Sequence, residues 1–331
     1  MKRVSDADLR LLRIFSTGAD SRGFAAAQAA LNLSAPSISG YITALEQRLG
    51  VRLCTRGRAG FSLTDKGAVI YREAQRLFGA MDEFVSHAGA VKGRTTGTLR
   101  IGLVDCTVTD PNAPIARAVQ RFNQREHDVR IELSIAAPTA LQRNVLERRL
   151  HLAIASFPVE ISVLTAEPLY DEINSFYCGA GHPLFAKPEV TLEDIQAGRI
   201  VARSYWRGAD LSRIGVEREA AAVEIMEAQA TLILSGSYLG FLPEHYAAPW
   251  VAERRLRRLL PERLSYVSPF SMIVRRPVAE QQVVRQFIED LRASLPDTRV
   301  PQIGARMSTR QRGGRAARGK PRPVDAVAVR S

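Results

Sequence analysis

Residues 22–64 read RGFAAAQAALNLSAPSISGYITALEQRLGVRLCTRGRAGFSLT and predict two short helices, a tight turn between them and a basic hairpin after them. Five alanines favour a helix over residues 24–31, because alanine has a high helix propensity and lets a second helix pack closely. Ser34 is a typical N-cap for the second helix, and Pro36 in the first turn loses no hydrogen bond. Gly50 is expected to end that helix.

The two faces of the second helix differ in composition. One face is an apolar stripe of Ile38, Ile42, Leu45 and Leu49. The opposite face carries small residues, namely Ala35, Pro36, Ser37, Ser39, Gly40 and Thr43. Low bulk, hydroxyl groups and a positive helix end suit entry into the DNA major groove. These features predict a DNA-reading helix.

The hairpin is expected to have strands over 51–53 and 61–63, with Arg56 and Arg58 in the turn. Arginines at such a tip suit contact with DNA phosphates. Each residue also has a simpler interpretation: Ser34 as a helix cap alone, and the two arginines as a solvated turn. Together the helices and the hairpin predict a winged helix-turn-helix.

This segment resembles the LysR-type transcriptional regulators. The resemblance is carried by Gly23-Phe24, Ala26-Ala27, Leu31, the S-x-P-x-x-S core at Ser34, Pro36 and Ser39, Leu45-Glu46, the run 49–53, Leu63-Thr64 and Gly67. The chain departs from the family at Ala35 and Gly40, where longer side chains are common, and this affects site preference. The resemblance implies DNA contacts by Arg22, Gly23, Ser34, Ala35, Pro36, Ser37, Ser39, Gly40, Thr43, Arg52, Arg56 and Arg58.

Charge is concentrated at the two ends of the chain. Of the net charge of +12 on 331 residues, residues 1–97 carry +6 and residues 299–331 carry +8, which leaves −2 for the middle. This distribution is expected if the ends meet a polyanion. The three cysteines, Cys54, Cys106 and Cys178, have neither disulfide nor metal spacing, so no metal and no cofactor are expected. Without a signal peptide or an apolar run of membrane length, we expect a cytoplasmic protein that contacts no membrane.

A long helix is predicted over 66–92, followed by a polar hinge to residue 97. Its apolar residues recur at alternating spacings of four and three: Ile70, Ala74, Leu77, Met81, Phe84, Ala88 and Val91. Such a stripe packs either on its own domain or on a second copy. The resemblance favours a linker helix that pairs in a homodimer, with a tetramer as the larger expected assembly. Two recognition helices on two half-sites would multiply the discrimination of one.

From residue 98 onward the pattern strand, helix, strand, helix, strand predicts a mostly parallel sheet. The order of elements resembles the family's effector domain, which is similar to type 2 periplasmic-binding proteins. The resemblance implies an α/β fold with two lobes, crossing near 166–169 and 265–269. We therefore expect a helical DNA-binding domain (1–65), a linker helix and hinge (66–97), an effector domain (98–296) and a disordered basic tail (297–331). Lobe one would comprise 98–165 plus 268–296, and lobe two 166–267.

Four segments are expected to line the cleft between the lobes, where α/β proteins bind ligands. They contribute Asp105, Cys106, Thr107, Thr109, Ala137, Thr139, Arg203, Ser204, Tyr205, Gln229 and Thr231, and Trp206 is a further aromatic candidate. Hydroxyls, exposed N–H groups and one arginine form a plausible cradle for a carboxylate or an aromatic acid. The threonines are equally interpretable as helix caps, Trp206 as core, and Arg203 as the partner of an internal acid.

Three function classes remain open at this point. The leading one is a regulator that binds promoter DNA and responds to a small effector, with RNA polymerase as a possible further partner. The second is an architectural protein that coats DNA with its basic ends. The third is an enzyme using Cys106 or one of the five histidines. No nucleophile motif surrounds Cys106 and the histidines show no metal spacing, so we expect no catalytic activity. Cys106 is interpretable either as a redox-sensitive thiol or as a small buried filler, the latter being preferred.

Overall fold

The computed structural model describes residues 4–21, 24–57, 60–91, 95–206, 208–279 and 281–296. Arg22, Gly23, Arg58 and the basic tail lie outside these ranges. No helix among the described residues has both the length and the apolar character that a membrane span requires.

The N-terminal part is helical with one small hairpin. Its elements are α1 (Asp6–Asp20), α2 (Phe24–Leu31), α3 (Ala35–Leu49), β1 (Cys54–Gly57), β2 (Gly60–Leu63) and α4 (Asp65–Val91). The predicted apolar stripe of α3 supplies its core, because Ile38, Ile42 and Leu45 are fully buried beside Phe15 of α1. The predicted winged helix-turn-helix is therefore confirmed.

The hairpin begins later than the sequence suggested. The Glu46 carboxylate accepts hydrogen bonds from the backbone N–H groups of Leu53 (2.7 Å) and Cys54 (3.3 Å), so residues 51–53 do not form the expected strand. Arg56 consequently lies within β1, in register with Phe61, and not in the turn. The side chain of Arg56 is outside the described part.

The apolar stripe of α4 divides into two halves. Ala74 is buried in the core of the N-terminal domain, and Ile70 and Leu77 pack against that core. Further along, Met81 is 39% exposed, Phe84 is 73% exposed and Ala88 is exposed. The first half therefore follows the alternative of packing on its own domain, while the second half is left uncovered in the single chain. The side chain of Val91, the last stripe residue, is outside the described part.

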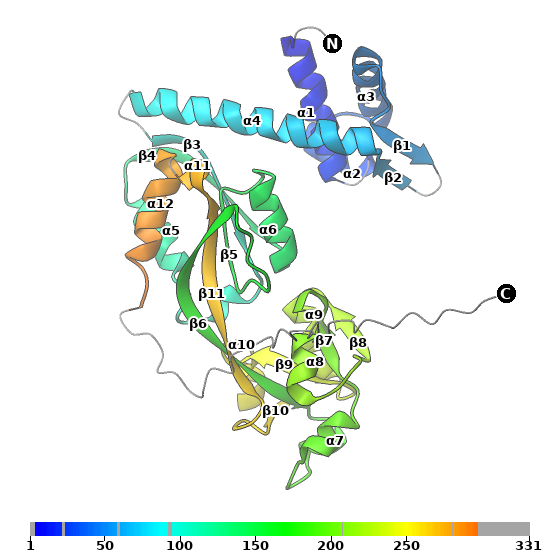
Figure 1. Ribbon diagram of the computed structural model, residues 1–331, viewed down its shortest axis with the longest axis vertical. Coiled ribbons are helices and arrows are strands. Elements are labelled where there is room, and N and C mark those ends of the chain that lie inside the picture. Colours follow the sequence, from blue (N-terminus) through cyan, green and yellow to red (C-terminus); the bar gives the residue numbers. More distant parts are fainter. Residues whose placement is uncertain are drawn as a thin grey trace, which may run out of the picture. The chain divides into compact units, whose positions relative to one another are not determined.

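The rest of the chain is an α/β domain in two lobes (Figure 1). The first lobe begins with β3 (Thr95–Leu103), η1 (Thr107–Thr109), α5 (Ile115–Asn123), β4 (His127–Ile135), α6 (Pro138–Leu146), β5 (Leu152–Ala155) and β6 (Leu164–Gly179). The second lobe continues with η2 (Pro183–Phe185), α7 (Leu192–Gln196), β7 (Val201–Arg203), η3 (Ser204–Trp206), α8 (Ala209–Ile214), β8 (Ala221–Val223), α9 (Met226–Leu234), β9 (Leu239–Pro243), α10 (Glu244–Ala252) and β10 (Leu256–Leu259). The chain returns through β11 (Ser265–Arg275), α11 (Arg276–Ala279) and α12 (Gln282–Arg292).

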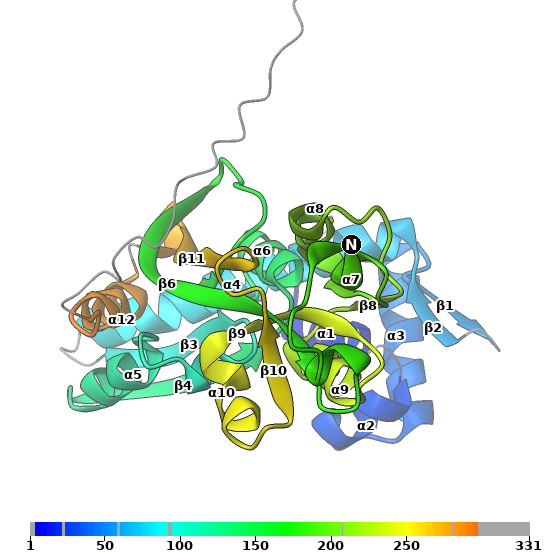
Figure 2. The same ribbon diagram turned by 90° about the horizontal axis from the view of Figure 1, so that it is seen from below.

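One mixed sheet runs through both lobes, in the order β10-β6-β11-β5-β3-β4, with β9 also paired to β6. The pairs β3–β4 and β3–β5 are parallel as predicted, but β6 and β11 pair antiparallel with each other and with their other neighbours. Figures 1 and 2 show β6 and β11 as the two long strands that join the lobes. In lobe one, α5 and α12 lie together on one face of the sheet and α6 lies on the other (Figure 1).

Each lobe has its own core. Along β6, Tyr170 belongs to the core of lobe one and Phe176 to that of lobe two. The crossing in β6 therefore falls later than the expected 166–169. Along β11 the change falls between Tyr266 and Phe270, which overlaps the expected 265–269.

Two helices begin earlier than the sequence suggested. Helix α6 starts at Pro138, so Pro138 and Thr139 form its first turn and are not a loop. Helix α9 starts at Met226, whereas the sequence suggested a start near Thr231. No side chain caps α9 locally, because its N-cap is Ile225. This is the reason that local patterns misplace its beginning.

Candidate functional site: a DNA-facing helix and an interlobe cleft

The outward face of α3 is available to a partner. Ser34, Pro36, Ser37, Gly40 and Thr43 are exposed, and Ala35 and Ser39 are half-buried. The first turn contains no acidic residue, so the positive end of the helix dipole is not offset there. A methyl group added at Gly40 would meet no atom within 4 Å, which leaves the backbone open to close approach. Arg52, just beyond α3, is exposed as well.

Ser34 caps α3 as predicted. Its Oγ accepts a hydrogen bond from the Ser37 backbone N–H at 3.3 Å and lies 2.8 Å from Ser37 Oγ. Thr43 donates its hydroxyl proton to Ser39 O at 2.9 Å, so its methyl group and hydroxyl oxygen form the outer surface. The cap and the DNA-facing role are compatible, because both use exposed oxygen atoms.

A small cavity lies between the two lobes. Its lining comprises Val104, Asp105, Pro138, Ser156, Glu172, Arg203, Tyr205, Trp206, Met226, Pro243, Ser268 and Phe270. The cavity volume is only about 20 Å³, which is room for roughly one water molecule. The cleft is therefore closed in this structure, and an effector of several heavy atoms requires the lobes to separate.

Asp105 holds the two lobes together across this cavity. Its Oδ2 accepts a hydrogen bond from the backbone N–H of Met226, the first residue of α9. Burial raises the pKa of Asp105, and the hydrogen bond from Met226 partly opposes that rise. A carboxylate from lobe one thus occupies the anion-binding N-terminus of a helix in lobe two.

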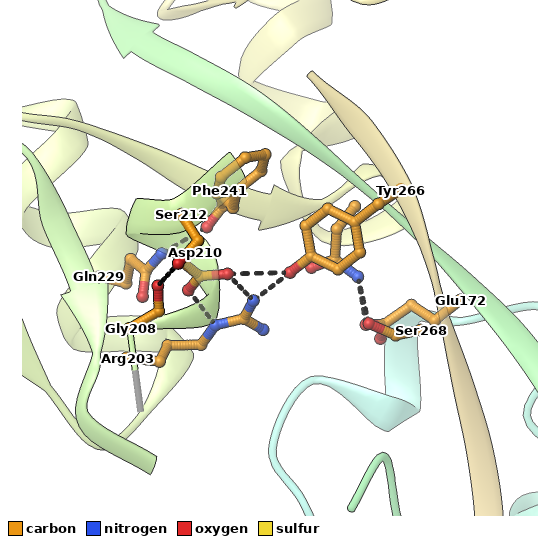
Figure 3. Close-up of polar contacts among 10 residues, drawn as sticks. Glu172, Arg203, Gly208, Asp210, Ser212, Gln229, Phe241, Tyr266 and Ser268 are labelled. Atoms are coloured by element: carbon orange, nitrogen blue, oxygen red, sulfur yellow. Dashed lines mark hydrogen bonds and ion pairs between the residues drawn. The ribbon is translucent and has the colours of Figure 1, made fainter. Parts of the chain in front are cut away.

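Arg203 is committed to an internal partner. Its Nε and Nη2 donate to Oδ2 and Oδ1 of Asp210 at 3.0 and 2.9 Å, and Nη2 also donates to the Tyr266 hydroxyl. Figure 3 shows the guanidinium facing these two partners. Burial alone would lower the pKa of Arg203, but Tyr266 and Asp210 raise it well above its usual value. Arg203 lines the cavity, and the structure shows the alternative interpretation of this residue, the partner of an internal acid.

Two of the predicted cleft residues, Gln229 and Thr231, do not line the cavity. Gln229 is fully buried within α9 and donates from Nε2 to Phe241 O at 2.5 Å, so it is part of the core. Thr231 is exposed in the same helix, and its hydroxyl donates to Glu227 O one turn earlier at 2.8 Å. Both residues lie inside α9 and not before it, because the helix begins at Met226.

The remaining predicted residues surround the cavity without all lining it. Tyr205 and Trp206 line it as an aromatic wall. Thr107 is buried and bonds Val104 O, and Ser204 is exposed and bonds Val223 O. Ala137 precedes α6 and Thr139 is exposed in its first turn, so Pro138 is the lining residue of that segment.

Cys106 has the character of a packed side chain. It is half-buried against the core of lobe two. Burial, together with the neighbouring carboxylates of Asp105 and Glu172, raises the pKa of its thiol. These described neighbours include no positive charge that would stabilise a thiolate, which favours the interpretation of Cys106 as a small buried filler.

Several lining residues were missed from the sequence. Glu172 and Ser268 come from the middle of the long strands β6 and β11, and Met226 from the start of α9. Strand interiors usually indicate core and not a ligand site. Glu172 and Ser268 line the cavity because β6 and β11 pass from one lobe to the other at this point, which the sequence does not show.

Comparison with known proteins gives a consistent result. Residues 9–68 match the family model described as "Bacterial regulatory helix-turn-helix protein, lysR family", and residues 92–296 match "LysR substrate binding domain". The chain is 38% identical over 295 residues to the HTH-type transcriptional activator BauR of Pseudomonas aeruginosa, which covers 88% of this chain and 97% of that protein. It is 30% identical over 244 residues to the SDS degradation transcriptional activation protein of a Pseudomonas species, covering 73% and 74% respectively.

Solved structures show the same fold. The crystal structure of CbnR, a LysR family transcriptional regulator, aligns with a TM-score of 0.60 and 20% identity, covering 87% of this chain and 99% of that one. Full-length CbnR complexed with its target DNA aligns with a TM-score of 0.58. The two family models together span the winged helix-turn-helix and the two-lobed domain, so this chain belongs to the LysR family of DNA-binding transcriptional regulators with an effector-binding domain.

Proposed function

We propose that the protein activates transcription from a promoter that it binds as a dimer or tetramer, and that a small carboxylate controls it by entering the interlobe cleft. Activation is supported by the 38% identical relative, which is a transcriptional activator. The domain boundaries expected from the sequence belong to this proposal, with the crossing in β6 placed between Tyr170 and Phe176.

DNA contact is assigned to the exposed N-terminal face of α3 and to the arginines of the hairpin. Ser34, Ser37 and Thr43 present hydroxyl oxygens there, and Arg52 is exposed beside them. Arg22, Gly23 and Arg58 are included on the family pattern alone. Hydroxyls and arginines are common phosphate ligands, so much of the affinity should depend on salt.

Self-association is assigned to the second half of α4. Met81, Phe84 and Ala88 leave an apolar strip exposed on a helix whose first half is already packed. An exposed phenylalanine in such a strip is costly in water, and a second copy of the helix would cover it.

The observation that carries the effector proposal is the hydrogen bond from Met226 N–H to Asp105. The N-terminus of α9 already binds a carboxylate, that of Asp105. With this hydrogen bond in place the cavity is too small for a ligand. An effector carboxylate that replaces Asp105 at this position would separate Asp105 from α9 and open the cleft. Tyr205 and Trp206 would then face the effector's apolar part.

The test uses the full chain and a thermal-shift screen of small aliphatic and aromatic carboxylates. A hit should bind more tightly to Asp105→Ala, because the internal competitor is gone. Asp128→Ala, an exposed acid on β4, is the matched control and should leave the affinity unchanged. Weaker binding to Asp105→Ala, or stabilisation by amines and not by acids, would reject the proposed carboxylate site.

DNA binding is tested separately by footprinting on the region upstream of the protein's own gene. A discrete footprint supports the promoter-binding regulator. Uniform coating would favour an architectural role, and no binding at low salt would contradict the assignment of α3.

A further inference from the structure

Two buried carboxylates and one half-buried histidine, from three segments, meet beside the cleft. Asp110 follows η1, Glu172 lies in β6, and His245 lies in α10. One ligand atom from each lies within 4.8 Å of the other two. His245 Nε2 is 3.1 Å from Glu172 Oε1 and 3.6 Å from Asp110 Oδ2. Two carboxylates and one imidazole nitrogen therefore face a common point.

Each of the three side chains is fixed from behind. Glu172 Oε2 accepts a hydrogen bond from Asn174 Nδ2 at 2.9 Å, and Asp110 Oδ1 accepts one from the Asn112 backbone N–H at 2.8 Å. His245 Nδ1 lies 2.8 Å from Thr109 Oγ1. The outer atom of every ligand is thus engaged, and the inner atoms are the ones that face each other. Metal-binding side chains are typically held in this way by hydrogen-bond partners on the side away from the ion.

The common point brings two carboxylates beside one imidazole nitrogen. The Thr109 hydroxyl donates to Cys106 O at 2.9 Å, and its oxygen lies 2.8 Å from His245 Nδ1. Nε2 of the same ring faces both carboxylates and lies within hydrogen-bonding distance of Glu172 Oε1, at 3.1 Å. Burying two carboxylates this close together is unfavourable without a shared proton or a cation between them.

Two buried atoms provide independent support for a ligand here. The Tyr170 hydroxyl and Asp110 Oδ2 are both buried and have no hydrogen-bond partner among the described residues. Tyr170 is only 8% exposed. Burial raises the pKa of Tyr170, and the charges of Asp110 and Glu172 raise it further, so its hydroxyl lies within their field. Buried polar atoms without partners often mark an absent ion or water.

We propose that Asp110, Glu172 and His245 bind one divalent transition-metal ion, with Zn²⁺ preferred over Mg²⁺. On a tetrahedral Zn²⁺ with bonds of about 2.0–2.2 Å, ligand atoms lie roughly 3.3–3.6 Å apart, close to the two separations seen at His245 Nε2. An imidazole beside carboxylates suits zinc-type ions, while magnesium prefers oxygen ligands and retained water. Two negative carboxylates and a neutral imidazole balance the charge of the ion.

The ligands belong to different parts of the two-lobed domain. Asp110 lies in lobe one, directly after η1 in the connection that follows β3. His245 lies on α10, which packs on β9 and β10 in lobe two. Glu172 lies in the stretch of β6 between the two cores. A bound ion would therefore tie the lobes together near the crossing and favour the closed cleft. The site needs neither DNA nor effector to bind its ion.

The test measures metal binding by the untagged full-length protein after chelation and dialysis. Titration with Zn²⁺ should give one ion per chain, and Co²⁺ should produce visible absorption bands from a site of low coordination number. Mg²⁺ at the same concentration should neither bind nor displace Co²⁺. Absence of stoichiometric Zn²⁺ binding would overturn the proposal. The cluster would then be held together by a proton shared between His245 and the two carboxylates.

Variants locate the site. His245→Gln and Glu172→Gln should each weaken Zn²⁺ binding by at least about 100-fold, and Thr109→Val by roughly tenfold because it orients the imidazole. His182→Gln, which removes a histidine outside the cluster, is the matched control and should bind as the wild type does. Equal affinity of His245→Gln and wild type would reject these ligands. A gel shift on the same samples reports folding and DNA binding, so failure of the metal site is distinguishable from failure of the regulator.

Discussion

Arg203 and Asp210 form a two-point ion pair in the interior of lobe two, and each side chain is only 4% exposed. The guanidinium also lies 6.0 Å from the Tyr205 ring centre and 5.4 Å from that of Trp206. The pair therefore supports the aromatic wall of the cleft from behind. Its role is to position these rings, with its charge already compensated by Asp210.

Asp210→Ala should destabilise the effector domain by about 3–5 kcal/mol, because it leaves a buried arginine without its partner. Urea unfolding followed by circular dichroism measures the change. The double variant Arg203→Met with Asp210→Leu should cost much less than the single one. A single variant as stable as the wild type would show that Arg203 is not dependent on Asp210.

Gly67→Ala should destabilise the winged helix-turn-helix by about 3 kcal/mol or more, since an added Cβ would lie 1.8 Å from Leu53 O. Gly40→Ala is the matched control, as its Cβ meets nothing within 4 Å. That change should stabilise α3 slightly through helix propensity. Thermal unfolding of both variants checks the contrast, and similar melting temperatures for the two would contradict it.

His151 should make stability depend on pH. Burial, and to a smaller extent the positive charge of Arg100, lower the pKa of His151 to about 4. The unfolded chain, with a pKa near 6.5, binds the proton first. Stability is therefore complete above about pH 6.5 and falls as the pH drops toward 4, by up to about 3 kcal/mol.

The measurement is urea unfolding between pH 4 and 7. His151→Gln should flatten the curve in this window, whereas His127→Gln, at a histidine outside this pocket, should not. A wild-type curve that rises as the pH falls through this range would contradict the sign of the effect.

Phe84→Asp should weaken self-association at least tenfold, because it places a charge in the exposed apolar strip of α4. Light scattering across a dilution series measures the association. Arg72→Asp, an exposed change in the first half of the helix, serves as the control. Unchanged association of Phe84→Asp would place the dimer contact elsewhere.

The hairpin and α3 should divide the work of DNA binding. Arg56→Ala is expected to weaken binding to all sequences alike and to reduce the salt slope by about one ion. Ser37→Ala or Thr43→Ala should instead change which sequences are preferred. Competition gel shifts with several operators compare the two. Equal effects from both kinds of change would refute this division.

Local signals predicted the DNA-binding part closely. Ser34, Pro36 and Gly50 act within a few residues of their own positions, so the bounds of α3 follow from the sequence. The start of α9 did not follow, because the group that bonds its first N–H is Asp105, far away in the chain. A cap supplied by another lobe leaves no trace in the neighbouring residues.

The proposed metal site could not be predicted for the same reason. Asp110, Glu172 and His245 show no ligand spacing, and the sequence therefore predicted no metal site. Likewise, the pairing of Arg203 with Asp210 was foreseen only as an alternative, since sequence does not show which acid faces which arginine. The fold was accessible from periodicity, whereas the cleft chemistry required the crossing of β6 and β11.

The two long strands have a mechanical consequence. Strands β6 and β11 are hydrogen bonded in continuous antiparallel register, with one irregularity between Phe270 and Ser271. Sliding one lobe past the other would break this ladder, whereas twisting preserves it. We therefore expect an occupant of the cleft to rotate one lobe relative to the other about the β6–β11 pair, and not to shift it along the strands.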